Sequence, residues 1–337
     1  MGFGFHLTFG FKILDLKQII LDFPNQFRVG IESAKNVKFE GTFKNVLLCG
    51  MGGSIIPAEI LKLITYNLKL KTNFYIHRDY DLPEWASKES LIICTSWSGN
   101  TEETITSYES GHKKDIPLIT ISKGGKLKEL SQKNGVPLIL LPDEPIPPRL
   151  GVGYMFSALF TVLASNGLIE NQLSDLEKLE KTLNPEKFDD KAQELAQKIT
   201  NKIPLNYASY KWRNLAAFWK IFFNESAKTH SFWNAFPGMT HQEIAGFNKK
   251  DGDKFFALLL KDKDDDPRQN KSLEKLSKIL DDSGYGYEII NIEGGNVLEK
   301  IFNNYLFAAL TSMYSAQFRR VDPGEDELIE KFKEMEK

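Results

Sequence analysis

The chain has 337 residues, of which 42% are hydrophobic and 26% are charged. This length fits two domains of about 150 residues, each with a sizeable core. The formal net charge of −2 excludes the strong basic field that general nucleic-acid binding requires. No apolar run approaches the roughly 18 residues of a membrane span. We expect a soluble, cytoplasmic protein, with no signal peptide in Met1–Leu14.

Short β-rich apolar runs alternate with helical stretches in the first half of the chain. The predicted strands are Val46–Cys49, Phe74–Ile76, Leu91–Thr95, Pro117–Ile121 and Pro137–Leu141. The predicted helices are Ile55–Tyr66, Glu102–His112, Leu127–Asn134 and Tyr154–Ala164. This alternation predicts a parallel sheet covered on both faces. Cys49 and Cys94 lie in strand runs, so we expect buried thiols in a reducing compartment.

The second half repeats the pattern more loosely. We predict strands at Ile203–Ala208, Phe255–Leu260 and Tyr287–Ile292, and helices at Lys211–Phe223 and Val297–Phe318. The polar segment Lys261–Lys271 is expected to be a solvated loop. The sequence therefore predicts an α/β protein with two doubly wound parallel-sheet domains. These domains span residues 22–168 and 193–321, with a helical linker at 169–192 and a short helical tail at 322–337.

A glycine-rich loop, Gly50-Met51-Gly52-Gly53-Ser54, follows the first predicted strand. Gly52 and Gly53 permit positive φ and let a ligand approach the backbone closely. The loop lacks the spacing of a dinucleotide fingerprint, and no Gly-Lys-Ser/Thr follows, so a nucleotide site is disfavoured. A tight strand-to-helix turn without a ligand is the alternative interpretation.

A second loop, Thr-Ser-Trp-Ser-Gly-Asn-Thr at 95–101, opens the helix that begins near Glu102. A helix N-terminus exposes unpaired N–H groups and a positive partial charge, which suit a phosphate monoester. An N-cap uses one hydroxyl, whereas Ser96, Ser98 and Thr101 place three within six residues. We expect these hydroxyls, with Ser54, to bind a phosphate, because both loops follow the carboxyl ends of parallel strands.

These two loops resemble a sugar isomerase (SIS) domain. From about Asp22 to the C-terminus, the chain is similar more narrowly to the bifunctional phosphoglucose/phosphomannose isomerases of archaea and bacteria. The further matching elements are Pro147-Pro148-Arg149 with Tyr154, Asn224-Glu225-Ser226-Ala227-Lys228, Phe236-Pro237 with His241-Gln242-Glu243-Ile244-Ala245-Gly246, and Asp322-Pro323 with Ile329 and Lys333. Their order and compatible spacing make the combination specific.

The resemblance implies isomerisation of glucose 6-phosphate to fructose 6-phosphate through a cis-enediol. Whether mannose 6-phosphate is also a substrate is left open. A carboxylate must carry a proton between C1 and C2, and Glu225 is the candidate. Arg149 is the candidate cation beside the developing enediolate oxygen. His241 is the candidate for ring opening, because histidine side chains ordinarily titrate near neutral pH. Lys333 matches the lysine that assists ring opening, with Lys331 as its alternative.

Each candidate also has an ordinary interpretation, namely an exposed helical glutamate, a surface arginine or a surface histidine. The resemblance implies a homodimer in which the histidine reaches the neighbouring subunit's site. No cofactor is expected, and no metal, because no cluster has ligand spacing. Gln242, Ser226 and Gly324 depart from the family pattern, and the bulky Trp97 stands beside the hydroxyls of the second loop, which leaves the hexose preference open. A pentose- or amino-sugar-phosphate isomerase and a non-catalytic sugar-phosphate sensor are the alternatives.

Overall fold

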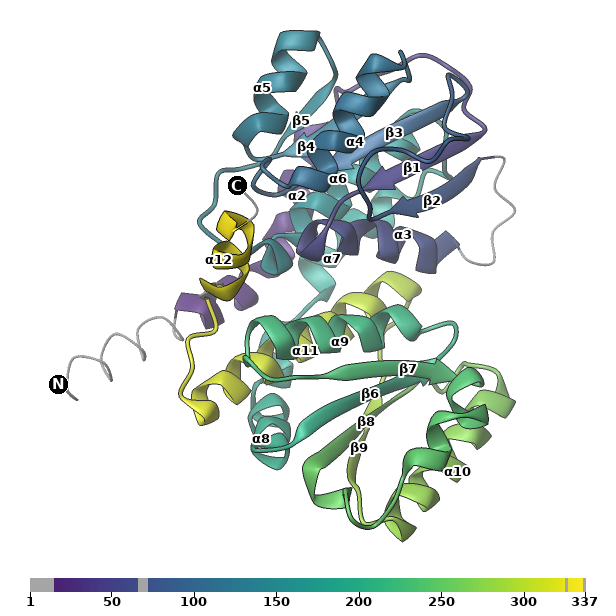
Figure 1. Ribbon diagram of the computed structural model, residues 1–337, viewed down its shortest axis with the longest axis vertical. Helices are drawn as coiled ribbons and strands as arrows, with labels where there is room; N and C mark the ends of the chain where they lie inside the picture. The colour runs from purple at the N-terminus through teal and green to yellow at the C-terminus, as the bar shows by residue number, and fades with distance from the viewer. Residues whose placement is uncertain (1–14, 66–71, 325–326, 336–337) are drawn as a thin grey trace, which may run out of the picture. The chain divides into compact units, whose positions relative to one another are not determined.

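The computed structural model describes residues 15–65, 72–324 and 327–335. The chain divides into two compact units, residues 22–182 and residues 1–21 together with 183–337 (Figure 1). Two expectations, the absence of a signal peptide in Met1–Leu14 and the end of a helix at Tyr66, fall outside the described residues. No described helix is both long enough and apolar enough to cross a bilayer.

The unit formed by residues 22–182 contains a five-stranded parallel sheet in the order β2-β1-β3-β4-β5. Its strands are β1 (Asn45–Cys49), β2 (Asn73–His77), β3 (Ser90–Thr95), β4 (Leu118–Ser122) and β5 (Leu138–Leu140). Its helices are α2 (Gln26–Ala34), α3 (Ile56–Thr65), α4 (Glu102–Lys113), α5 (Gly125–Asn134), α6 (Val152–Ser165) and α7 (Leu173–Thr182). This is the strand order of flavodoxin-like folds.

Helices cover both faces of this sheet (Figure 1). Cys49 and Cys94 are register partners on β1 and β3, and both pack with Tyr108 of α4 and Leu127 of α5. A hydrogen bond with Cys49, reinforced by burial, raises the pKa of the Cys94 thiol well above its usual range. Cys94 therefore stays a protonated thiol, and both cysteines are free, buried core residues, as their apolar surroundings predicted.

The second unit contains a four-stranded parallel sheet in the order β7-β6-β8-β9, which repeats the order of the first four strands of the other sheet. Its strands are β6 (Ile203–Ser209), β7 (Phe232–Phe236), β8 (Phe255–Lys261) and β9 (Gly286–Asn291). Its helices are α8 (Asp189–Ile199), α9 (Arg213–Glu225), α10 (Pro267–Asp282), α11 (Val297–Arg319) and α12 (Glu327–Met335). The prediction of two doubly wound parallel-sheet domains with a helical tail is confirmed.

The helices of this unit also form two layers. Helix α11 packs on α8 and α9, whereas α10 covers the opposite face through Leu273, Leu276 and Leu280 (Figure 1). The segment 169–192 is helical, with α7 belonging to the first unit and α8 to the second.

Two features of the second unit differ from the predictions. Strand β7 was not predicted, and the expected loop Lys261–Lys271 is shorter because α10 begins at Pro267. Asp266 caps α10 by accepting from the Arg268 N–H at 2.8 Å. Asp262 is buried rather than solvated, because Lys300 Nζ lies 2.7 Å from its carboxylate and Trp212 Nε1 donates to it at 3.0 Å.

Candidate functional site

The hydroxyl-rich loop between β3 and α4 is held together by its own side chains. Ser96 Oγ lies 2.9 Å from Thr101 Oγ1 and accepts from the Gly99 N–H at 3.0 Å. Ser98 is exposed, and its Oγ accepts from the Asn100 N–H at 3.2 Å. Thr101 is the N-cap residue of α4, yet within the described chain its side chain makes no capping hydrogen bond. The first turn of α4 therefore keeps its N–H donors available to an anion.

The glycine-rich loop is tied to the hydroxyl-rich loop through a buried serine. Gly52–Ile55 forms a 3₁₀ turn directly after β1, and Ser54 is only 5% exposed. Ser54 Oγ accepts from the Trp97 N–H at 2.9 Å. Gly52 has φ of +51°, the left-handed conformation that glycine adopts without strain. Through this hydrogen bond the buried Ser54 hydroxyl holds the backbone of the hydroxyl-rich loop in place.

A third loop, which the sequence analysis did not single out, packs against the hydroxyl-rich loop. Asn100 Oδ1 accepts from the Lys126 N–H at 3.0 Å, and Gly99 O accepts from the Leu127 N–H at 2.9 Å. A Cβ on Gly99 would lie 1.8 Å from Gly124 O, so the two backbones approach closely there. The Gly124-Gly125 pair directly after a predicted strand was the available signal.

Arg149 is completely buried, at 0% exposure, in the 3₁₀ turn Pro148–Leu150. This excludes the surface arginine that was its ordinary interpretation. The turn packs against the glycine-rich loop, because a Cβ on Gly53 would lie 2.5 Å from Arg149 N. The Trp97 ring fills the space beside Gly151 and stacks on Tyr154, with 6.0 Å between ring centroids. Ser54, Trp97 and Arg149 are thus brought into one cluster at the carboxyl ends of β1 and β3.

Gly53→Ala should expose this close packing. The added methyl meets backbone atoms of Pro148 and Arg149, so the backbone must shift, and we expect the free energy of unfolding to fall by about 1–3 kcal/mol. Gly124→Ala is the matched control in the same unit, because nothing lies within 4 Å of its ideal Cβ. Urea unfolding measures both variants, and equal stability of the two would contradict the packing described.

Glu225 is the last residue of α9 and is half-buried. Lys228 follows it with φ of +51°, and Lys228 Nζ donates to the Glu225 carbonyl at 2.6 Å. This tight exit from the helix fixes the backbone that carries the Glu225 carboxylate. Its ordinary interpretation was an exposed helical glutamate, whereas Glu225 is half-buried.

His241 is exposed and ends the 3₁₀ turn Gly238–His241, which follows β7. Within this unit, Glu225 and His241 lie at opposite edges of the sheet. Helix α9 runs back from the carboxyl end of β6 to the start of β7, so Glu225 lies at the amino edge and His241 at the carboxyl edge. The five residues of β7 separate the two edges by about 16 Å. The two side chains of one chain are thus not brought together within this unit.

Lys331 and Lys333 both lie on α12 and are exposed. Lys333 Nζ is 2.6 Å from Glu330 Oε1, an exposed ion pair one turn apart. The apolar side chains of Leu328 and Phe332 are also exposed on this helix. The predicted helical stretch is therefore present, and the side chain of the candidate Lys333 is exposed to solvent.

Comparison with known proteins complements this geometry. Residues 188–335 match the model of the bacterial phospho-glucose isomerase C-terminal SIS domain. A bifunctional phosphoglucose/phosphomannose isomerase of Caldicellulosiruptor bescii is 31% identical over 320 residues, which cover 90% of this chain and 94% of the relative. The chain belongs to this isomerase family.

Two other comparisons give a relative with a different named activity and a solved structure of similar fold. A D-glucosamine-6-phosphate 4-epimerase of Sulfolobus acidocaldarius is 27% identical over 298 residues, covering 87% of this chain and 89% of the relative. The C-terminal domain of glucosamine-fructose-6-phosphate aminotransferase from Francisella tularensis is similar in fold. It has a TM-score of 0.72 at 14% identity and covers 92% of this chain and 97% of that one. The two chains therefore share a fold although few of their residues are identical.

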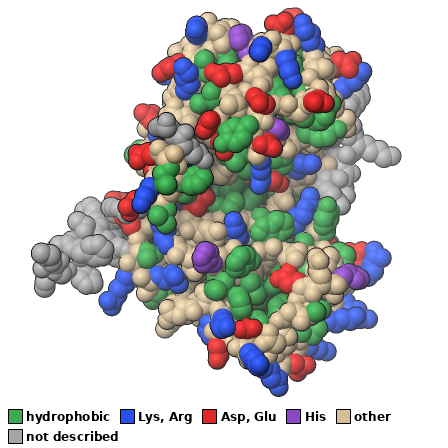
Figure 2. All heavy atoms as spheres, in the orientation of Figure 1, with side chains coloured by type: hydrophobic (Ala, Val, Ile, Leu, Met, Phe, Trp, Pro, Cys, Tyr) green, Lys and Arg blue, Asp and Glu red, His purple; other side chains and the backbone are tan. Residues whose placement is uncertain are grey.

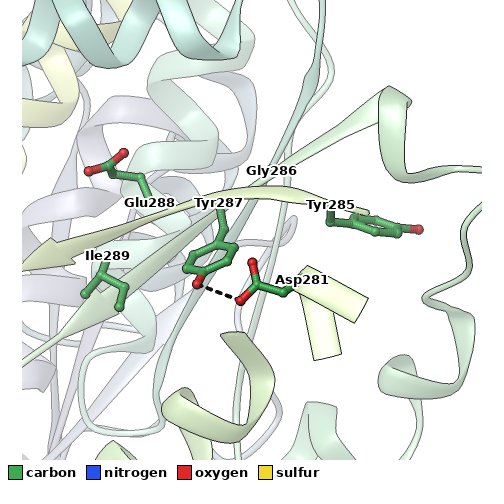
Figure 3. Close-up of a pocket in the computed structure, with 6 residues that line it drawn as sticks. All are labelled: Asp281, Tyr285, Gly286, Tyr287, Glu288 and Ile289. Carbon is green, nitrogen blue, oxygen red and sulfur yellow. Dashed lines mark hydrogen bonds between the residues drawn. The ribbon is translucent and has the colours of Figure 1, made fainter. Parts of the chain in front are cut away.

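A hollow of about 480 Å³ lies over β9 in this isomerase-family chain, lined by Asp281, Tyr285, Gly286, Tyr287, Glu288 and Ile289 (Figure 3). Tyr287 Oη donates to Asp281 Oδ2 at 3.2 Å across it. None of the candidate residues lines this hollow. It is open to solvent, whereas small-molecule sites usually enclose most of their ligand.

Charges are mixed over the surface of the isomerase-family chain. On the face that Figure 2 shows, Lys and Arg side chains are interspersed with Asp and Glu. Among the residues that the structure describes, no group of three or more His, Cys, Asp or Glu is placed to hold a metal ion. The functional candidates are therefore the hydroxyl and arginine cluster of one unit and Glu225, His241 and the α12 lysines of the other.

Proposed function

We propose that this chain interconverts glucose 6-phosphate and fructose 6-phosphate, with mannose 6-phosphate as a second aldose. The observation that carries the proposal is the cluster of hydroxyls at the start of α4, joined through Ser54 and Trp97 to the buried Arg149. It offers a phosphate site next to a desolvated cation. The similarity to bifunctional phosphoglucose/phosphomannose isomerases supports the same hexose phosphates.

In this proposal the phosphate binds at the N-terminus of α4. Ser98 is exposed and Thr101 keeps its hydroxyl off the helix cap, so both can turn towards an anion. The buried Ser96 and Ser54 hold the loop in shape through their bonds to Gly99, Thr101 and Trp97. Neutral hydroxyls and backbone donors bind a phosphate without the fixed charge of a lysine.

Ser98→Ala should weaken phosphate binding with little effect on chemistry. A hydrogen bond from a neutral donor to a charged group is worth about 1.5–3 kcal/mol, so KM should rise by roughly one to two decades. The control is Ser277→Ala on α10, whose exposed hydroxyl donates to the Glu274 carbonyl one turn earlier. Steady-state kinetics with fructose 6-phosphate measures both, and an unchanged KM in Ser98→Ala would remove Ser98 from the phosphate site.

The chemistry then divides among the other candidates. Glu225 carries the proton between C1 and C2, and Arg149 stabilises the negative charge that develops on the enediolate oxygen. His241 exchanges a proton with the ring oxygen or its hydroxyl, and Lys333 assists it. Every one of these steps uses a side chain of the protein, so we propose that no metal or cofactor takes part.

We further propose a homodimer in which each site takes Glu225 from one chain and His241 from its partner. The position of Glu225 and His241 at opposite edges of one sheet supports this division. We also propose a cytoplasmic location, which the two buried thiols support because they form no disulfide. The proposed substrates support a role in glycolysis or gluconeogenesis.

His241→Ala should abolish catalysed ring opening. Ring opening and reclosure interconvert the α and β anomers of glucose 6-phosphate, a process that needs no C2 proton transfer. Exchange NMR of the anomeric protons should therefore show no catalysis above the spontaneous rate in His241→Ala, whereas Glu225→Gln should still catalyse it. Mixing these two inactive dimers should restore isomerisation through hybrids. Normal anomerisation by His241→Ala, or no recovery after demonstrated subunit exchange, would contradict the assignment.

The substrate class is tested by a panel assay of the purified protein. Fructose 6-phosphate should yield glucose 6-phosphate and mannose 6-phosphate. Ribulose 5-phosphate and glucosamine 6-phosphate should react slowly or not at all. A preference for the pentose phosphate would make this chain the related isomerase, and epimerisation of glucosamine 6-phosphate would favour the activity named for the Sulfolobus relative. Binding of all three substrates without turnover would indicate a sensor.

A further inference from the structure

One carboxylate, that of Glu243, joins the segment carrying His241 to the second sheet. Tyr207 Oη donates to Glu243 Oε1 at 2.6 Å, and Asn234 Nδ2 donates to Glu243 Oε2 at 2.5 Å. Tyr207 on β6 and Asn234 on β7 are register partners in neighbouring strands. Both oxygens of the carboxylate are therefore held, each from a different strand.

The two donors are fixed in their roles. Tyr207 is 1% exposed, and burial, aided by the neighbouring Glu243, raises the pKa of its phenol far above its usual range. The hydroxyl consequently keeps its proton and donates it. The Ala235 N–H donates to Asn234 Oδ1 at 2.8 Å, which leaves the Asn234 amide nitrogen facing Glu243. Neither donor can turn without losing a bond.

Apolar packing anchors the same segment on both sides of His241. Met239 is fully buried in the core cluster that includes Tyr207, and Ile244 and Phe247 pack against that cluster. His241 itself is exposed, two residues after Met239 and two before Glu243. The histidine thus lies between an apolar anchor and a polar one. Apolar packing holds the segment against the core, whereas the two directional hydrogen bonds to Glu243 fix its orientation.

We propose that Glu243 is a positioning residue that fixes the backbone of His241 through Tyr207 and Asn234. This inference rests on the proposed role of His241 in ring opening. Glu243 has both carboxylate oxygens occupied by protein donors, so it acts through the segment and not on the substrate. Its loss should slow ring opening and leave the proton transfer by Glu225 untouched.

Exchanging the carboxylate of Glu243 and the amide of Asn234 between the two positions tests this proposal. In Glu243→Gln, whichever way the new amide turns, one of its N–H donors faces the Asn234 amide or the Tyr207 hydroxyl. In Asn234→Asp, two carboxylates face each other. The double variant Glu243→Gln/Asn234→Asp restores one donor–acceptor pair with reversed polarity, and the new carboxylate at position 234 still accepts from the Ala235 N–H.

Each single variant should lower catalysed anomerisation and kcat for fructose 6-phosphate together, by about 10- to 100-fold, the usual cost of a misplaced catalytic group. The double variant should recover most of both. Affinity for 5-phosphoarabinonate, an acyclic mimic of the enediolate, should stay within about threefold of wild type throughout, because that ligand bypasses ring opening.

Hydrogen exchange supplies a readout that does not depend on activity. Amides of residues 238–247 should exchange faster in both single variants and return to the wild-type rate in the double, while those of β8 stay unchanged. Tyr287→Phe and Glu288→Gln are matched controls, because they remove an exposed tyrosine–aspartate bond and an exposed ion pair of the same unit. Neither should alter exchange in 238–247.

The outcomes separate the positioning role from the function on which it rests. If His241→Ala keeps catalysed anomerisation, the proposed role of His241 fails. If His241→Ala loses it while both single variants keep wild-type rates, the positioning role alone fails. A folded double variant, shown by its melting temperature, that recovers neither rate nor exchange would also overturn the proposal.

Discussion

Glu225→Gln should abolish isomerisation while leaving the substrate bound. The glutamine keeps the volume and most hydrogen bonding of the side chain, but it cannot accept a proton at neutral pH. A positioned acid–base group is usually worth about 10²–10⁴ in rate, so kcat should fall by at least that factor. The proposed phosphate contacts belong to the other unit, on the loop before α4, so the dissociation constant for fructose 6-phosphate should change little.

Two measurements make this result interpretable. Glu194→Gln on α8, an exposed glutamate of the same unit, should keep wild-type turnover. Isothermal titration with 5-phosphoarabinonate should show that Glu225→Gln still binds. Wild-type kcat in Glu225→Gln would assign the base to another group. Loss of both binding and the folded state would give Glu225 a structural role, which Glu225→Asp would then confirm by restoring the fold without the activity.

Arg149→Lys should lose most turnover although the positive charge is kept. The arginine is fully buried in a turn that packs on Gly53, so its planar guanidinium is held in one orientation. A lysine ammonium is a single point donor on a flexible stem and cannot reproduce that fork. Removing one donor to a developing oxyanion costs about 10²–10³ in kcat, and we expect a loss of that size.

The loss in Arg149→Lys should fall on kcat more than on KM, because in the proposed mechanism the charge that Arg149 stabilises develops only as the reaction proceeds. Arg268→Lys on α10, whose arginine is exposed and pairs with Asp266, is the matched control and should be silent. A raised KM at normal kcat would instead make Arg149 a ground-state phosphate ligand. Thermal unfolding distinguishes either outcome from misfolding.

Much of the fold was predictable because its central strands are buried on both faces. Runs such as Val46–Cys49 and Leu91–Cys94 are apolar throughout, and each is followed by a turn-forming loop. The loops that follow the carboxyl ends of β1 and β3 were predictable for the same reason. Strand β7 escaped prediction because it is an edge strand with Phe232 and Trp233 exposed, and its sequence does not form a continuous apolar run.

Other features depend on partners far away in sequence. Asp262 is buried because Lys300 and Trp212 meet it, and nothing in the polar segment around it indicates that pairing. The same holds for Glu243, whose partners on β6 and β7 are defined only by the sheet register. The separation of Glu225 from His241 likewise follows from strand order, which a motif match does not contain.

The most direct test of the isomerase proposal is conversion of fructose 6-phosphate by the purified protein in D₂O, followed by NMR. A carboxylate that returns a solvent-exchanged proton through a cis-enediol predicts glucose 6-phosphate and mannose 6-phosphate that carry deuterium at C2. The Glu225→Gln protein should form neither product. Formation of no aldose phosphate by the wild-type protein, or of aldose phosphates whose C2 deuterium is unaffected by Glu225→Gln, would contradict the proposal.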